Sequence, residues 1–321
     1  MHDSLDPIKN NGEFLHYYKY AIVISNRFKP KHKADSIIFD LSADELKDVS
    51  KLQNLYNLDF INNKEKVFIA LTPQIFHFIT DNLQPILYHY KRNNNVQFII
   101  DTALIQEHQS SHLDIQDVLV RFLNFLEADY FIVSSNPCDI VLDNVFYHNS
   151  FGKTEKYLFE IQEILRKCYN INNDIIPNKK IYVSRSKVDL IRQNESRSDV
   201  RLYNSKIIED FLIENSFSII FFEDFSFKDR LNLLNETKLI SGVSGSGLMG
   251  ALFMQENQTV IEYQKMLFDG KVNDQKHLHF QYESMAYIRK HLFLCINSDP
   301  YAENLIKQIK NNKTLMSLIS E

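Results

Sequence analysis

Short apolar segments alternate with helical patterns along the second half of the chain. Strands are expected over residues 180–184, 218–222, 239–243 and 259–263, and helices over residues 205–215 and 227–237. Nearly continuous apolar strands that alternate with helices form parallel sheets covered on both faces. This half is therefore predicted to be an α/β domain with a doubly wound, Rossmann-like sheet.

A less regular alternation occupies the first half of the chain. The expected strands are residues 20–25, 36–41, 67–71, 96–100 and 130–134, and the clearest helical patterns cover 73–92 and 115–127. Pro85 lies inside the first helical pattern and is expected to kink or split it. A chain of 321 residues exceeds the usual size of a single core. Two α/β domains, 1–175 and 176–321, are predicted, with a linker in the polar stretch 170–178.

The tail from 301 to 319 has the pattern of an amphipathic helix and carries Lys307, Lys310 and Lys313. Two interpretations remain open for this helix. It either packs back across the first domain, as an ordinary amphipathic helix does, or lies on a membrane surface.

Four of the seven glycines fall within nine residues, at positions 242, 245, 247 and 250. An apolar strand precedes this cluster and an apolar helical segment follows it. The N-terminus of such a helix presents N–H groups and a positive dipole end, which together bind anions. In parallel sheets ligands bind beyond the carboxyl ends of the strands, where this turn is expected to lie.

The spacing of these glycines also matches the G-x-G-x-x-G pattern of dinucleotide-binding domains. That pattern is normally followed by a full crossover helix, with an acidic residue about 20 positions on. Here the helical segment is short and Glu262 comes too early, which favours one nucleoside diphosphate over a dinucleotide. The structural alternative is that the glycines only permit close packing of the helix on the strand.

Composition excludes several other classes of function. The net charge of −5 gives no general attraction to nucleic acid. Three widely separated cysteines without C-x-x-C spacing indicate neither a disulfide framework nor a zinc site. The first residues lack the pattern of a signal peptide, and no apolar run approaches the ~20 residues that span a bilayer. A cytoplasmic protein is expected, either free or peripheral at the inner face of the membrane.

Several segments of the second half, taken in order, resemble glycosyltransferase family 61. They are Tyr182 to Arg185, Arg192 to Glu195, Gly242 to Leu248, Leu252 to Met254 and Val260 to Glu262, and a weaker match covers Phe76 to Asp81. The resemblance implies a GT-B type fold of two facing doubly wound domains and an inverting sugar transfer from a nucleotide sugar. The chain departs from the family pattern at Ser244, Ser246 and Gly250, where the family usually has His, Ala and Asn.

An inverting transfer requires stabilisation of the departing nucleoside diphosphate. The chain contains no Asp-x-Asp pair to hold a divalent ion, so neither a metal nor another cofactor is expected. The residues expected to hold the donor instead are Arg185, Arg192, Ser244, Gly245, Ser246 and Gly247. Glu262 is expected to bind the ribose hydroxyls, and Asn194 and Glu195 to position the arginine segment. The structural alternatives are a surface salt bridge for Arg185 and a buried ion pair for Glu262.

The transfer also requires a base that deprotonates the acceptor hydroxyl. His77 and Asp81 are four residues apart and so share one face of a helix. Asp81 is the preferred base, with His77 orienting the acceptor or touching a donor phosphate. The alternative is a core histidine beside a solvated aspartate.

The predicted function is a metal-independent, inverting glycosyltransferase that moves a hexose or pentose from a UDP-linked donor. The predicted acceptor is a glycan or lipid-linked glycan in the synthesis of bacterial capsule or lipopolysaccharide. Two other classes remain open. One is a non-catalytic relative that binds glycans or nucleotides, which Ser244 would suit because serine cannot carry the charge of the family's histidine. The other is a dinucleotide-dependent oxidoreductase.

Overall fold

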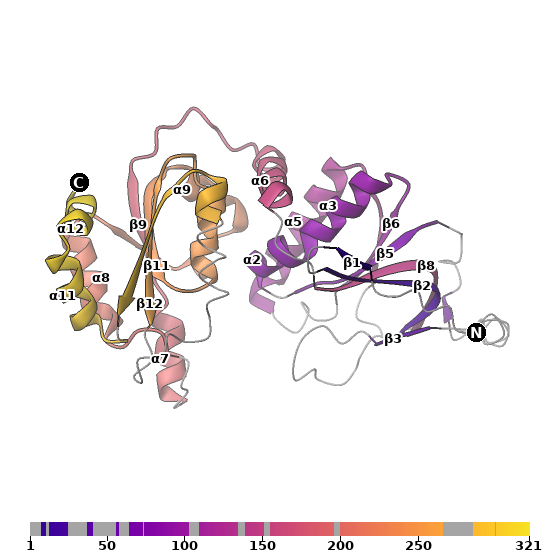
Figure 1. Ribbon diagram of the computed structural model, residues 1–321, viewed down its shortest axis with the longest axis horizontal. Helices are drawn as coiled ribbons and strands as arrows, with labels where there is room; N and C mark the ends of the chain where they lie inside the picture. The colour runs from indigo at the N-terminus through magenta and orange to yellow at the C-terminus, as the bar shows by residue number, and fades with distance from the viewer. Residues whose placement is uncertain are drawn as a thin grey trace. The chain divides into compact units, whose positions relative to one another are not determined.

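The computed structural model describes residues 8–10, 13–24, 37–40, 56–57, 64–72, 74–102, 109–133, 139–150, 155–195, 200–265, 285–298 and 300–321 (Figure 1). The chain forms two compact units, residues 1–168 and 169–321. Both combine helices with a sheet that contains parallel strands, so the predicted α/β class is confirmed. In the described part of the chain, no helix is both long and apolar enough to cross a bilayer.

The first unit contains an eight-stranded mixed sheet in which the strand order is β1-β2-β8-β5-β6-β7, while β3 pairs with β2 and β4 with β8. The strands are β1 (Ile8–Asn10), β2 (Glu13–Ile24), β3 (Ile37–Asp40), β4 (Tyr56–Asn57), β5 (Lys66–Ala70), β6 (Gln97–Asp101), β7 (Asp129–Val133) and β8 (Asp139–Ser150). The sheet departs from the predicted doubly wound form because β2 pairs antiparallel with β1, β3 and β8. Polar residues interrupt β2 and β8, so neither has the continuous apolar run of a buried parallel strand.

The helix expected over 73–92 consists of three consecutive segments, α2 (Ile75–His77), the π-helical turn η2 (Phe78–Asn82) and α3 (Leu83–Arg92). The break precedes Pro85, which lies in the first turn of α3, where a missing N–H is tolerated. The unit also contains α5 (Gln109–Phe125) and α6 (Glu155–Cys168), which pack against each other.

The sheet of the second unit is entirely parallel, with the strand order β10-β9-β11-β12-β13. The strands are β9 (Lys179–Val183), β10 (Ser218–Ile220), β11 (Thr237–Val243), β12 (Thr259–Lys265) and β13 (Leu292–Ser298). The chain moves outward from β9 to β10 and then returns to β11 on the other side of β9. The winding therefore reverses between β9 and β11, and open α/β sheets bind ligands at such a switch point.

Helices cover both faces of this second sheet (Figure 1). The helical segments of the unit are α7 (Ser186–Asn194), α8 (Ser205–Glu214), η3 (Phe222–Asp224), α9 (Phe227–Asn235), η4 (Ser246–Phe253), α11 (Ala302–Asn311) and α12 (Lys313–Ser320). Residues of α8, α11 and α12 form one core with the side chains of one sheet face. On the other face α9 packs against η4 through Phe227 and Phe253, whose ring centroids are 5.9 Å apart. The sequence expectations did not include α7 or β13.

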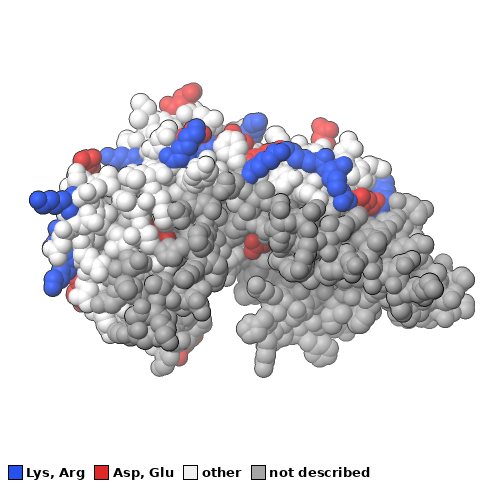
Figure 2. Space-filling view, viewed as in Figure 1, with Lys and Arg blue, Asp and Glu red and all other residues white. Residues whose placement is uncertain are grey.

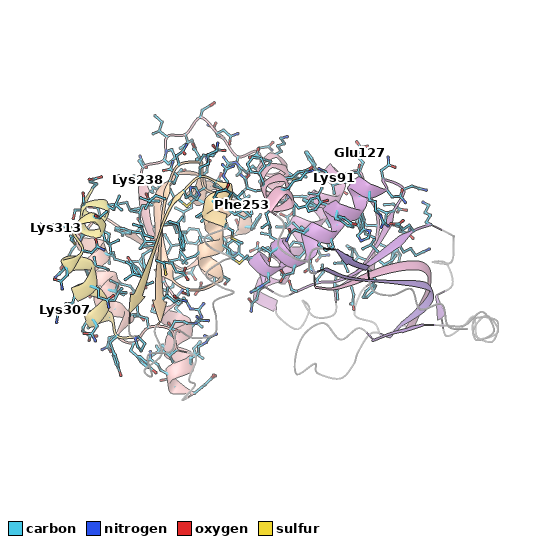
Figure 3. All side chains as sticks on the ribbon, in the orientation of Figure 1. Lys91, Glu127, Lys238, Phe253, Lys307 and Lys313 are labelled. Carbon is cyan, nitrogen blue, oxygen red and sulfur yellow. The ribbon has the colours of Figure 1, made fainter. Side chains whose placement is uncertain are left out.

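The helix predicted over 301–319 is divided at Asn312. The Asn312 side chain accepts a hydrogen bond from the Leu315 N–H at 3.1 Å and so caps α12. Leu305, Ile309, Leu315 and Ile319 are buried in the core of the second unit. The labelled Lys307 and Lys313 lie on the outer side of these two helices (Figure 3).

On the face drawn in Figure 2, basic side chains lie along the upper rim with acidic ones among them. The ion pairs of the described residues include Arg121 with Asp117 and Lys290 with Glu256. Exposed pairs of this kind add little stability, so the two apolar cores carry most of the folding free energy.

Three of the four clustered glycines allow close packing, two of them in η4 and Gly242 in β11 against β9. A Cβ atom on Gly247 would lie 2.5 Å from Val183 Cγ1, and one on Gly250 would lie 3.0 Å from Leu234 Cδ2. A Cβ on Gly242 would lie 3.1 Å from the Val183 carbonyl oxygen. The packing interpretation of the glycine cluster therefore holds for these three positions.

We expect Gly247→Ala to lower the free energy of unfolding by about 1 to 3 kcal/mol, the usual cost of overpacking a core. The added methyl group would overlap Val183, so the loss should be smaller in a Val183→Ala background. Urea denaturation of the two single variants and the double variant measures this coupling. Additive effects of the two substitutions would contradict it.

Candidate functional site

Arg185 and the glycine turn meet at the switch point of the second sheet. Arg185 follows β9 and Gly245 follows β11, and these strands are hydrogen-bonded neighbours. A Cβ atom on Gly245 would lie 2.8 Å from Arg185 Nη1 and 3.5 Å from Arg185 Cδ. The absence of a side chain at 245 therefore leaves room for the guanidinium to lie against the backbone of the turn.

Three residues of the turn, Gly245, Ser246 and Gly247, are half-buried, so part of their surface meets solvent. Arg185 is also half-buried. The Leu248 N–H donates to the Gly245 carbonyl at 3.0 Å at the start of η4. The N–H groups at the start of a helix have no carbonyl one turn earlier to accept their hydrogen bonds. The turn thus combines backbone donors with a guanidinium, as an anion site requires.

Ser244 and Glu262 contact each other beneath this turn. The Ser244 hydroxyl donates to Glu262 Oε1, and the Ser244 N–H donates to the Tyr263 carbonyl at 3.0 Å. Glu262 is opposite Gly242 in β12, three residues before the strand ends, and is fully buried. In this arrangement its carboxyl group supports the turn from below.

Burial raises the pKa of the Glu262 carboxyl from 4.5 to about 7, although the Ser244 hydroxyl and the Arg201 charge oppose the shift. The negative form of a buried carboxyl group loses more hydration than the neutral form, which explains the direction. Glu262 therefore titrates close to neutral pH.

The segment that contains Arg192 and Asn194 is the helix α7, and Glu195 follows it directly. Arg192 is half-buried in the last turn of α7, and Asn194 and Glu195 are exposed at its end. A nine-residue helix is about 13 Å long. The structure therefore separates Asn194 and Glu195 from Arg185, which lies at the start of the same helix.

Asp189 is a buried residue of α7 that sequence reasoning missed. Its carboxylate oxygens accept hydrogen bonds from the N–H groups of Arg201 and Leu202, both at 3.3 Å. Burial raises the pKa of Asp189, while the positive charge of Arg185, these two N–H groups and the charge of Arg192 lower it. Asp189 thus links α7 to the segment before α8, and a lone acid in a helical sequence gives no signal of this role.

Ser184 fixes the start of α7 beside Arg185. Its hydroxyl donates to Glu209 Oε1 at 2.6 Å and accepts from the Ser186 N–H at 3.0 Å. Ser184 and Glu209 are both buried. The backbone that carries Arg185 is therefore anchored to α8.

The other end of η4 is held by His291 and Arg289, which were also missed. His291 Nε2 donates to the Ala251 carbonyl at 2.9 Å, and His291 Nδ1 accepts from the Gln258 N–H at 3.1 Å. Arg289 Nε donates to the Met254 carbonyl at 3.1 Å. Burial lowers the pKa of His291 from 6.5 to about 4, so the ring is neutral at pH 7.

In the first unit, His77 and Asp81 form a hydrogen-bonded pair. His77 Nδ1 lies 3.2 Å from Asp81 Oδ2, and each side chain is 38% exposed. The Thr80 hydroxyl donates to Asp81 Oδ1 at 2.8 Å. Both carboxylate oxygens thus contact neighbouring side chains. Because an ionised carboxylate only accepts hydrogen bonds, this contact suits the His77 tautomer that has its proton on Nδ1.

The π-helical turn that carries this pair is attached to the carboxyl end of β5. Asn82 Oδ1 accepts from the Thr72 N–H at 2.9 Å, and Asn82 Nδ2 donates to the Ala70 carbonyl at 2.9 Å. π-helical turns are rare and occur often at functional sites. The pair therefore lies beyond the carboxyl end of a parallel strand, where α/β proteins bind ligands.

No group of three or more His, Cys, Asp or Glu side chains that could hold a metal ion occurs among the described residues. His77 and Asp81 provide two such groups. The second unit thus offers arginine side chains and backbone donors, and the first unit offers a His–Asp pair.

The family model described as Glycosyltransferase 61 matches residues 75–261, which is more than half of the chain. The chain belongs to glycosyltransferase family 61. The matched range contains both the His77–Asp81 pair and the glycine turn, and the predicted family is confirmed. No curated protein matches the sequence. As a glycosyltransferase, the protein binds a sugar donor and an acceptor.

The raised pKa of Glu262 predicts a pH-dependent stability. Between pH 4.5 and about 7 the folded state retains a proton that the unfolded state has released, so the free energy of unfolding falls as pH rises. We expect Glu262→Gln to remove this loss. The free energy of unfolding of the variant, taken relative to that of the unsubstituted protein, should therefore rise by about 3 kcal/mol from pH 4.5 to pH 8.

Urea denaturation at several pH values measures this difference. Glu256→Gln is the matched control, because the hydrogen bond from Lys290 lowers the pKa of Glu256. Its difference from the unsubstituted protein should stay nearly constant between pH 4.5 and pH 8, because both its folded and its unfolded pKa lie at or below 4.5. A constant difference for Glu262→Gln across the pH range would contradict the buried-carboxyl interpretation.

Proposed function

We propose that this glycosyltransferase transfers a hexose or pentose with inversion from a UDP-linked donor to a glycan acceptor, without a metal ion. The contact between Arg185 and Gly245 at the switch point carries this proposal. It provides a fixed positive charge and backbone donors at the place where parallel sheets bind nucleotides. Two facing domains of the GT-B type are part of the proposal.

In the donor half of the reaction, the bond between the anomeric carbon and the diphosphate oxygen breaks. Negative charge then develops on the departing diphosphate. The Arg185 guanidinium can form paired hydrogen bonds to phosphate oxygens, and the N–H groups of Ser246 and Gly247 can add to them. The diphosphate leaves with its charge stabilised by these groups.

In the acceptor half, we assign the base to His77 and give Asp81 a positioning role. This reverses the preference drawn from the sequence, because the Asp81 carboxylate accepts hydrogen bonds from both His77 and Thr80. With its Nδ1 proton held by Asp81, His77 takes the acceptor hydroxyl proton on Nε2 as the acceptor oxygen attacks the anomeric carbon.

The proposed setting is the synthesis of bacterial surface polysaccharide, such as capsule or lipopolysaccharide. The acceptor is then a glycan or a lipid-linked glycan. The proposed location is the cytoplasm or the inner face of the membrane, where nucleotide sugars are consumed. The Asn- and Lys-rich composition of the chain supports a bacterial setting.

We expect UDP to raise the melting temperature of the protein, and Arg185→Ala to weaken UDP binding by about 10- to 100-fold. Lys238→Ala is the matched control, because Lys238 lies near the amino end of β11, at the opposite edge of the same sheet (Figure 3). Thermal shift and calorimetry measure both effects. Stabilisation by NAD in place of UDP would favour the oxidoreductase alternative.

We expect His77→Asn to lower kcat by about 10²- to 10⁴-fold, because a general base is removed. Asp81→Asn should also lower kcat, because an amide in place of the carboxylate favours the wrong histidine tautomer. Release of UDP from a panel of UDP-sugars, with surface glycans as acceptors, measures the rates. Asp117→Asn, on the exposed face of α5, is the control.

If Asp81→Asn lowered kcat more than His77→Asn does, Asp81 would be the base. The unsubstituted protein could also bind UDP and yet release UDP from every donor only at the background rate. That result would favour a non-catalytic relative that binds nucleotides or glycans.

A further inference from the structure

The segment of residues 200–204 crosses the carboxyl edge of the second sheet between α7 and α8, and its backbone is fixed at both ends. At one end the Asp189 carboxylate accepts hydrogen bonds from the N–H groups of Arg201 and Leu202, with N···O distances of 3.3 Å in both. At the other end the Tyr203 N–H donates to the Pro300 carbonyl at 2.6 Å, and the Ala302 N–H donates to the Tyr203 carbonyl at 3.2 Å.

Two tyrosine rings strengthen the second attachment. Tyr203 and Tyr301 are stacked, with ring centroids 5.4 Å apart and an angle of 27° between their planes. Their backbones form an isolated parallel bridge. Because Tyr301 follows β13 and Tyr203 precedes α8, the segment is attached to two elements at the same edge of the sheet. Arg201 thus projects from a backbone held at both ends.

The position of Arg201 relates it to both parts of the proposed donor site. Asp189, which holds the Arg201 N–H, lies one turn after Arg185 in α7. The charge of Arg201 also acts on Glu262, which is hydrogen-bonded to Ser244 at the base of the glycine turn. Arg201 is half-buried, so part of its surface meets solvent.

We propose that Arg201 is a second arginine of the donor site and binds the diphosphate of the nucleotide together with Arg185. This inference rests on the proposed function, because it assigns a further residue to the same site. Arg185 lies against Gly245 after β11, whereas Arg201 is held through its N–H by Asp189, one turn further along α7. The two guanidinium groups contact different phosphates of a nucleoside diphosphate.

The chemistry of the ligand explains the need for two arginines. A nucleoside diphosphate carries more negative charge than one guanidinium neutralises, and it gains further charge when the sugar leaves. Guanidinium groups are weakly hydrated and bind phosphate oxygens in pairs. The backbone of Arg201 is already fixed, so ligand binding has to order only its side chain. The conformational entropy lost on binding is therefore smaller than for an arginine on a free loop.

The test compares Arg201→Ala, Arg201→Lys and Arg185→Ala in the full chain by calorimetry with UDP, UMP and uridine. We expect Arg201→Ala to weaken UDP binding by about 10- to 100-fold. It should weaken UMP binding less and leave uridine binding unchanged. Arg201→Lys should give an intermediate loss, since lysine retains the charge without the paired hydrogen bonds.

Lys206→Ala is the matched control, because it removes one positive charge from the exposed surface of α8, where Lys206 pairs with Asp210. It should bind UDP as the unsubstituted protein does. The backbone N–H of residue 201 is retained in every variant, so Asp189 keeps its partner. Circular dichroism and the melting temperature without ligand check the fold, and Arg201→Lys replaces Arg201→Ala if the alanine variant is unfolded.

Four outcomes decide between the alternatives. The proposal is supported if Arg201→Ala and Arg185→Ala both weaken UDP binding and leave uridine binding unchanged. Unchanged UDP binding in Arg201→Ala, together with loss in Arg185→Ala, overturns the role of Arg201 and leaves the proposed function standing. If Arg201→Ala and Lys206→Ala weakened UDP binding equally, the effect would come from the net charge of the protein. That outcome would overturn the assignment of Arg201. Absence of UDP binding to the unsubstituted protein would overturn both proposals.

Discussion

The parallel pairing of β9 with β11 is the constraint on which the candidate donor site depends. Gly242 lies opposite Val183 in this pair, so the residues that follow the two strands emerge side by side. Arg185 and Gly245 are 60 positions apart in the sequence and meet for this reason. The absence of a side chain at Gly247 then lets η4 approach Val183 of β9 closely enough to fix the turn. Gly247 thus allows close packing on Val183, while Gly245 leaves room for the Arg185 side chain.

Three buried carboxyl groups lie beneath this edge of the sheet, those of Asp189, Glu209 and Glu262. Each accepts hydrogen bonds from groups that shape the site: Asp189 from the Arg201 and Leu202 N–H groups, Glu209 from Ser184, and Glu262 from Ser244. Buried carboxylates are costly unless they are satisfied in this way. Their arrangement orients the surrounding backbone before any ligand binds, which lowers the entropy lost on binding.

The sequence predicted the parts of the fold that have strong local patterns. The apolar strands around the glycine turn and the helices α8 and α9 are present close to the expected positions. Of the long strands, only the last part of β2 was predicted and β8 was not, because polar residues interrupt them and their pairing joins distant segments. Arg185, the glycine turn and the His77–Asp81 pair could be selected from motifs and spacing. Asp189, Arg201, His291 and Arg289 could not, because their roles depend on contacts with residues far away in the sequence.

The contacts of His291 and Arg289 with η4 bear on where the functional part of this chain ends. The family match stops at residue 261, yet the carbonyl groups of Ala251 and Met254 are bound by side chains about 30 positions beyond that limit. Apolar residues of α11 and α12 also complete the core on one face of the sheet. A fragment cut to the matched range would lack an edge strand, two helices and the residues that hold the far end of η4. The segment that defines the family is therefore smaller than the unit that must fold to present its glycine turn.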